Sequence, residues 1–220
     1  MMHSIYNFVS GPLVWVSFFI CIFGSLYRII NLFLLAYKKE AFIFSFMSLK
    51  YSLRSILHWI IPFASTNMRK HPVMTLVTFM FHICLVFAPV FLLSHIVLWE
   101  ESWNISWWAL PDHVADLMTV IVILSCLFFL FRRLVLAEVK YVTSPTDYLL
   151  LFLVAAPFVT GFWAYHQFPG YAVALILHIL SGEMLLVAIP FTRLIHMVFA
   201  VFTRAYMGSE FGAVRHARDW

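Results

Sequence analysis

Five long apolar stretches constrain the fold of this chain more than any other feature. They cover about residues 12–36, 72–99, 113–132, 148–165 and 171–202, and charged or turn-forming residues separate them. A helix of roughly 20 apolar residues crosses a bilayer core of about 30 Å. The sequence therefore predicts an all-α integral membrane protein with five transmembrane helices, folded as a single domain over residues 1–220.

The composition excludes the main soluble classes of protein. Hydrophobic residues make up 64% of the chain and charged residues only 11%, whereas a soluble domain is about 25% charged. A soluble fold of this size lacks the interior to bury so much apolar surface, so we expect the lipid bilayer as a partner and no nucleic acid. Cys21, Cys84 and Cys126 stand singly, which excludes an iron–sulfur cluster held by this chain.

The basic residues lie on one side of this predicted topology. Lys and Arg fall in or close to the connections after the first, third and fifth spans, whereas the connection after the second span carries Glu100, Glu101 and Asp112. Cytoplasmic loops are the ones enriched in Lys and Arg. We therefore expect the N-terminus outside and the C-terminus in the cytoplasm.

Residues 47–62 differ from the five spans because their apolar residues alternate with basic ones at helical spacing. The apolar set is Leu49, Leu53, Ile56, Leu57 and Ile60, and Lys50, Arg54 and His58 lie between them. Such a pattern predicts an amphipathic helix that lies in the headgroup region with its basic side toward water. A docking surface for a cytoplasmic partner is the alternative interpretation.

Histidine is unusually frequent for a membrane protein, since its ten residues equal Asp and Glu together. Four lie inside spans: His82 and His95 in the second, His178 and His196 in the fifth. Polar groups inside a bilayer are costly and tend to mark function. Because the two spans run antiparallel, the four histidines sort into a cytoplasmic pair, His82 with His196, and an outer pair, His95 with His178. Two such pairs suit two haems, each ligated axially by imidazoles.

Helical phase supports the fifth-span assignment directly. The 18 residues from His178 to His196 make five whole turns, which places both on one face of a continuous helix. The 13 residues from His82 to His95 turn through about 220°, so that pair requires a kink at Pro89. His71 is nearly in phase with His82, but it borders the water. Hydrogen-bonded histidines without a cofactor are the alternative to haem ligands.

Three segments around these residues resemble the gamma subunit of respiratory nitrate reductase. LHILSGEMLLVAIPFTRLIH (177–196) is similar to its last helix, where LH and P-F-S/T-R-L-I-H bracket the same 18-residue interval. FRRLVLAEVKYVTSPTDYLLL (131–151) is similar to its basic connection between helices three and four. Phe81-His82 matches the pair that carries its first helix-two ligand. The likeness covers most of residues 73–203 and extends to membrane cytochrome b subunits of sulfate- and sulfur-respiring complexes.

The resemblance implies a five-helix cytochrome b with two haem b groups, in the cytoplasmic (inner) membrane of a prokaryote. Such a subunit exchanges electrons between quinone, menaquinone being the expected type, and a cytoplasmic iron–sulfur partner similar to heterodisulfide reductase. Further membrane subunits or a periplasmic multihaem cytochrome c are candidate additional partners. The chain would be one subunit of a quinone-dependent oxidoreductase rather than a complete enzyme. His178 and His196 carry over as ligands, and so does His82.

The sequence also departs from nitrate reductase itself. The second helix-two histidine of that subunit falls at Leu92 here, and His95 stands three residues further on. No lysine matches the quinone-site lysine of that subunit, and the basic connection over 37–72 is longer. These departures favour the sulfate- and sulfur-respiration branch.

Several further residues are candidates for proton transfer at an outer quinone site or for contact with haem. His113, Asp112 and Asp116 lie at the start of the third span, although Asp112 also suits a helix N-cap. Glu183 lies near the middle of the fifth span, where an unpaired carboxylate is costly. Arg193 suits a haem propionate or a lipid headgroup. Gly182 suits close approach of a haem edge or of a neighbouring helix.

A cofactor-free protein is the competing class. A proton-coupled transporter, in which the histidines and Glu183 form a relay, or a membrane anchor and assembly scaffold, would have the same composition. The sequence shows no inverted repeat, which many transporters contain. A subunit with one haem is a third interpretation.

Overall fold

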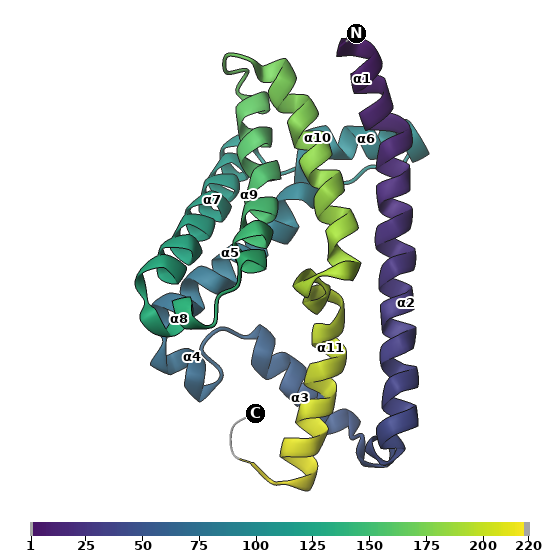
Figure 1. Ribbon diagram of the computed structural model, residues 1–220, viewed down its shortest axis with the longest axis vertical. Coiled ribbons are helices and arrows are strands. Elements are labelled where there is room, and N and C mark those ends of the chain that lie inside the picture. The colour runs from purple at the N-terminus through teal and green to yellow at the C-terminus, as the bar shows by residue number, and fades with distance from the viewer. Residues whose placement is uncertain (1, 218–220) are drawn as a thin grey trace. The chain divides into compact units, whose positions relative to one another are not determined.

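The computed structural model describes residues 2–217, and every regular element within that range is helical (Figure 1). In chain order the elements are α1 (Met2–Phe8), η1 (Val9–Leu13), α2 (Val14–Glu40), η2 (Ala41–Phe46), α3 (Leu49–Ile60), α4 (Thr66–Lys70), α5 (Pro72–Phe91), α6 (Leu93–Trp103), α7 (Asp112–Val135), α8 (Ala137–Tyr141), α9 (Pro145–Tyr165), α10 (Tyr171–Ala188), η3 (Ile189–Phe191), η4 (Arg193–Ile195), α11 (His196–Met207) and η5 (Gly208–Val214).

Five helical segments are long and apolar enough to cross a membrane. They are His3–Phe46, Pro72–Phe91, Asp112–Val135, Pro145–Tyr165 and Tyr171–Phe191. The predicted all-helical, five-span architecture is therefore confirmed, and the chain is a multi-pass membrane protein. The predicted orientation in the membrane stays a prediction.

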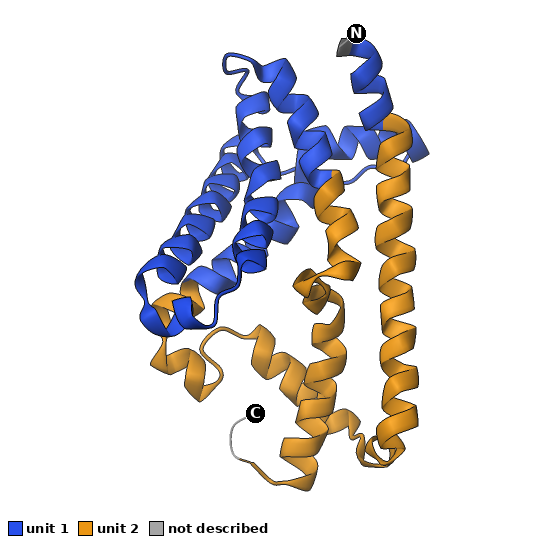
Figure 2. Ribbon diagram, in the orientation of Figure 1, with its two compact units in different colours: residues 1–10, 77–182 blue, residues 11–76, 183–220 orange. Residues whose placement is uncertain are grey.

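The chain divides into two compact units (Figure 2). Unit 1 comprises residues 1–10 and 77–182, and unit 2 comprises residues 11–76 and 183–220. Each unit is described by itself, and the expectation of a single domain stays a prediction.

Unit 1 is built around the pairing of α7 with α9. The buried residues of α7 form one stripe at spacings of three and four: Ala115, Thr119, Val122, Ser125, Cys126 and Phe129. Most of these side chains are small, which lets helices approach closely where no hydrophobic effect drives them together. Ser144 begins α9 with a capping box to Asp147, so the first turn of this helix has its free backbone groups satisfied.

Unit 2 contains the predicted amphipathic helix, which forms as α3 and packs against α11 and η5. The side of α3 that contacts these elements carries two serines rather than the leucines. Ser52 Oγ donates to the Ala205 carbonyl at 3.0 Å, and Ser55 is fully buried. Leu53 is half exposed. The apolar side of α3 is thus left outward, as an interfacial helix requires, and its place in the membrane stays a prediction.

A glycine permits this close packing. A Cβ built on Gly208 would lie 2.4 Å from the carbonyl oxygen of Tyr51 and 2.6 Å from Cβ of Ser55. Neither distance is tolerable for a side-chain carbon. The backbone of η5 therefore touches α3 only because residue 208 carries no side chain.

Two predicted continuous helices are interrupted. The sequence predicts one helix over 72–99, but α5 ends at Phe91, Leu92 is extended, and α6 begins at Leu93. The sequence also predicts one helix over 171–202, but α10 ends at Ala188 and Thr192 is extended, with φ −125° and ψ −174°.

Prolines explain both breaks. Pro89 and Pro190 each lie two or three residues before an extended residue, and each lacks the N–H that would continue the helical hydrogen bonds. The expectation that one uninterrupted helix carries the two fifth-span histidines is therefore wrong.

Candidate functional site

Two of the four predicted ligand histidines face each other within unit 1. His95 on α6 and His178 on α10 have ring centroids 5.9 Å apart, and their planes are inclined by only 19°. Both residues are half-buried. His95 reaches this position because the chain turns at Leu92 and His95 lies in the first turn of the new helix.

Each of these rings is held by the carbonyl of a proline. The Nδ1 atom of His95 lies 2.7 Å from the Pro89 oxygen, and Nδ1 of His178 lies 2.8 Å from the Pro157 oxygen. A carbonyl only accepts, so each Nδ1 donates. In its neutral form each ring therefore carries its proton on Nδ1 and a lone pair on Nε2, which is the form in which imidazole binds a metal.

The helix break supplies the acceptor for His95. The last carbonyls of a helix have no partner within it, and Pro89 lies in the last turn of α5. The His95 ring satisfies this oxygen. A single interruption of the span therefore both turns the chain and orients the ring.

Gly161, which the sequence analysis does not single out, makes room for His178. A Cβ at Gly161 would lie 2.8 Å from both Cε1 and Nδ1 of the His178 ring. The ring therefore rests directly on the backbone of α9, one turn beyond Pro157. The available signal was a glycine inside an apolar span, which commonly marks a close approach.

The separation of this pair fits two imidazoles that would hold one haem iron between them. Two metal–imidazole bonds of about 2 Å each, together with the half-width of each ring, place the centroids about 6 Å apart. The observed separation is 5.9 Å. Ligating histidines almost always donate their second N–H to a carbonyl, a carboxylate or water, which fixes their orientation. Both features are present here.

The other two predicted ligands have the same local arrangement. Nδ1 of His82 lies 2.8 Å from the Thr78 carbonyl, and Nδ1 of His196 lies 2.9 Å from the Arg193 carbonyl. Both rings are exposed. His82 belongs to unit 1 and His196 to unit 2, so their pairing stays a prediction. His71 caps the C-terminus of the short helix α4.

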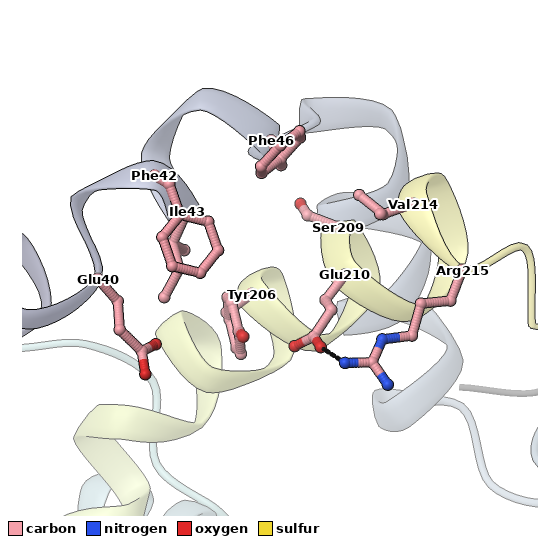
Figure 3. A pocket seen from close by; sticks show the side chains of 9 residues that line it. All are labelled: Glu40, Phe42, Ile43, Phe46, Tyr206, Ser209, Glu210, Val214 and Arg215. Atoms are coloured by element: carbon pink, nitrogen blue, oxygen red, sulfur yellow. Dashed lines mark hydrogen bonds and ion pairs between the residues drawn. The ribbon is translucent and has the colours of Figure 1, made fainter.

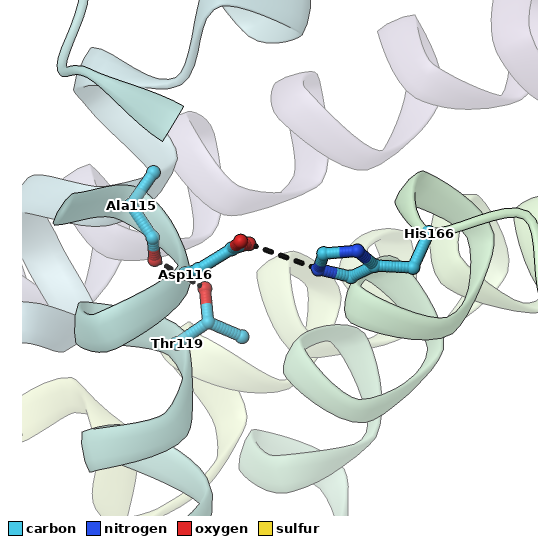
Figure 4. Close-up of polar contacts among 4 residues, drawn as sticks. All are labelled: Ala115, Asp116, Thr119 and His166. Atoms are coloured by element: carbon cyan, nitrogen blue, oxygen red, sulfur yellow. Dashed lines mark hydrogen bonds and ion pairs between the residues drawn. The ribbon is translucent and has the colours of Figure 1, made fainter. Parts of the chain in front are cut away.

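Two of the three predicted proton-transfer residues at the start of α7 contact the end of α9. Asp116 Oδ1 lies 3.1 Å from Nε2 of His166 (Figure 4). Asp112 interacts through a side-chain hydrogen bond with Tyr165, and it is the first residue of α7 rather than its N-cap. His113 is exposed.

Sequence reasoning missed His166. Its ring lies 4.3 Å from the ring of Phe162 and 5.7 Å from that of Phe168, measured between centroids. Asp116 and His166 lie fifty residues apart, at the matching ends of two antiparallel spans. Because these two ends meet in an antiparallel pair of spans, their positions in the sequence could have indicated that Asp116 and His166 lie close together.

Glu183 is the most unusual carboxylate of the described chain. Its exposed fraction is 6%, and both carboxylate oxygens are buried without a hydrogen-bond partner among residues 2–217. Next to it, a Cβ on Gly182 would meet nothing within 4 Å, so this glycine leaves open space.

Arg193 lies exposed in η4, three residues before His196.

Comparison with known proteins gives one informative match. The chain is 36% identical over 218 residues to a protein of Nitratidesulfovibrio vulgaris strain Hildenborough, and the match covers 96% of this chain and 95% of that protein. No family model and no solved structure matches the chain. The chain therefore belongs to the same family as this bacterial protein, whose name states no activity.

Proposed function

We propose that this chain is the dihaem cytochrome b subunit of a bacterial respiratory oxidoreductase, which passes electrons between quinone and a cytoplasmic iron–sulfur subunit. The observation that carries the proposal is the facing pair His95 and His178, with each Nδ1 held by a prolyl carbonyl. The resemblance of residues 73–203 to the nitrate reductase gamma subunit supports the same assignment.

The histidines would hold two haem b groups, one between His95 and His178 and one between His82 and His196. Bound haem supplies a one-electron carrier. The chain itself fixes the rings, because a donated Nδ1–H determines which nitrogen keeps its lone pair. Since the acceptors are backbone carbonyls of helices, the rings are oriented before any ligand arrives.

The charged residues at the ends of α7 and α9 suit the proton side of quinol oxidation. A quinol that gives up two electrons also releases two protons, and bases must accept them. Asp116 and His166 form a hydrogen-bonded pair in which a proton taken up at one group is shared with the other. Asp112, His113 and Glu183 are the further candidates for this task.

Two other residues are assigned to binding rather than to proton transfer. Arg193 precedes His196 by three residues, and its guanidinium suits a haem propionate. Gly182 leaves open space on α10, four residues after His178. The basic connections after the first, third and fifth spans suit an iron–sulfur partner of the heterodisulfide-reductase type, bound at the cytoplasmic surface of the inner membrane. The quinone is proposed to be menaquinone.

A reduced-minus-oxidised spectrum of the purified full chain tests this function. We expect a b-type α-band and two haems per chain, and His95→Ala should remove one of them. His3→Ala, which changes an exposed histidine on α1, is the matched control and should keep both. One haem in the unchanged chain would identify a monohaem subunit instead.

The buried carboxylate of Glu183 favours a second candidate function, a cofactor-free proton-coupled transporter. A carboxyl group with no partner is stable inside a bilayer mainly in its neutral form, and such a group can carry a proton. Two results together would assign the chain to this class. The chain, expressed with haem available, would show no α-band, and Glu183→Gln would abolish its proton flux in vesicles.

A further inference from the structure

Unit 2 contains a cavity that the proposed electron transfer does not use (Figure 3). It lies between η2 on one side and the end of α11 with η5 on the other, and its volume is about 370 Å³. Small-molecule sites begin at about 300 Å³. The lining residues are Glu40, Phe42, Ile43, Phe46, Tyr206, Ser209, Glu210, Val214 and Arg215.

One wall of the cavity is a chain of polar groups. Glu210 accepts a hydrogen bond from Tyr206 and forms an ion pair with Arg215. These contacts lower the pKa of Glu210, and the hydrogen bond to Glu210 raises the pKa of Tyr206 to about 12. At neutral pH the wall therefore carries a carboxylate, a guanidinium and an uncharged phenol.

Glu40 gives the cavity an excess of negative charge. It is the last residue of α2, its carboxylate faces the cavity, and Figure 3 shows it on the side of Tyr206. Two carboxylates thus face one guanidinium in the cavity, although Glu40 follows Lys38 and Lys39 in the sequence and the whole chain has a net charge of +4. Such a cavity favours a ligand with a cationic group, while Arg215 keeps further N–H donors for an anionic one.

The opposite wall is apolar and exposed. Phe42 and Phe46 on η2 have exposed fractions of 63% and 53%. They end the first membrane-spanning segment, which extends to Phe46. The cavity therefore lies at the end of a segment that can span a membrane, and its open aromatic side suits an acyl chain.

We propose that this cavity binds the phosphoethanolamine head group of a phospholipid. The primary ammonium lies against Glu40 and Glu210, the phosphate lies toward Arg215, and the acyl chains follow Phe42 and Phe46. A primary ammonium donates hydrogen bonds to carboxylates. The trimethylammonium of phosphatidylcholine cannot donate them, and phosphatidylglycerol has no cation. The binding is independent of haem.

Native mass spectrometry of the full chain tests this proposal. The chain is released from nanodiscs containing equal amounts of phosphatidylethanolamine, phosphatidylcholine and phosphatidylglycerol. We expect one retained phosphatidylethanolamine, and about a tenfold loss of retention in Glu40→Gln, because a charge-assisted hydrogen bond is removed. Glu138→Gln, at an exposed carboxylate of α8 in unit 1, is the matched control and should behave as the unchanged chain.

The result separates the lipid from its head group alone. Soluble glycerophosphoethanolamine at millimolar concentration should compete only weakly, because it lacks the acyl chains. Complete displacement by it would show that a soluble amine phosphate is the ligand. Equal retention of the three lipids, or unchanged retention in Glu40→Gln, would overturn the proposal. An equal loss in Glu138→Gln would do the same, by showing a general charge effect.

Discussion

Replacing Gly161 by alanine tests the geometry of the histidine pair directly. The added methyl carbon would lie 2.8 Å from Cε1 and Nδ1 of His178, whereas ordinary contacts begin at 3.4 Å. The ring must therefore move away from α9 by about 0.6 Å. The Pro157 carbonyl belongs to the same helix, so this movement also lengthens its 2.8 Å hydrogen bond toward the limit of such bonds.

Two consequences of this change can be measured. Overpacking of this kind costs about 1–3 kcal/mol of stability, which thermal unfolding of the purified chain in detergent would detect. Loss of a group that orients a ligating histidine lowers metal affinity by about 10–100-fold. Under the proposed function, pyridine haemochrome content, followed by haem titration of the apoprotein, should then show that one of two haems is bound weakly.

Gly11→Ala is the control for this experiment, because Gly11 lies in the first spanning segment, His3–Phe46. It makes the same substitution in a spanning helix, but its methyl group meets nothing within 4 Å. Alanine favours a helix over glycine by about 1 kcal/mol, so this variant should unfold no earlier than the unchanged chain and keep both haems. Full haem affinity together with unchanged unfolding in Gly161→Ala would refute the close contact between α9 and the His178 ring.

Three further predictions follow from other contacts. Gly208→Ala should lower the unfolding temperature and speed proteolysis within α3, because its Cβ would overlap backbone at 2.4 Å. The pKa of the Tyr206 phenol is raised to about 12, so the phenol should contribute stability that is complete below pH 10 and lost as the pH rises through about 12. The 295 nm titration of the unchanged chain minus that of Tyr206→Phe measures this pKa. Glu210→Gln should bring the pKa back toward 10. His95→Ala should remove one haem per chain and His71→Ala none, and the reverse haem contents would reassign the ligand.

The helices of this fold follow from sequence because a bilayer imposes one simple requirement. A spanning segment must satisfy its own backbone hydrogen bonds and present apolar side chains to lipid, and both conditions are visible in hydropathy alone. The amphipathic helix was equally readable, since the spacing of its leucines and basic residues predicts α3 to within two residues at each end.

The interruptions were not readable from the same signals. A proline in a spanning helix produces a kink, a break or a small adjustment, depending on which neighbours satisfy the freed backbone groups. At Pro89 the nearby His95 ring takes up a carbonyl, so a complete break is stabilised. Hydropathy carries no information on that contact. Counting helical turns from His178 to His196 failed because the chain is extended at Thr192, two residues after Pro190.

The sequence predicted that His95 and His178 lie close together, but it did not predict what surrounds them. Depth in the membrane paired His95 with His178 correctly as neighbours, because antiparallel spans fix which ends meet. Gly161 and His166 were missed, since their importance lies in contacts between α9 and other helices. Such contacts depend on how the helices are rotated about their axes, which uniformly apolar spans do not specify.

The extended residue Thr192 also has a mechanical consequence. A continuous helix transmits torque along its length, but here the hydrogen-bonded rod ends at Ala188 and a new one starts at His196. Because α11 packs against α3, a displacement of α3 would move the His196 ring, which lies on the first residue of α11. The His178 ring would keep the orientation set by Pro157. The break therefore separates the orientation of the His196 ring from that of the His178 ring.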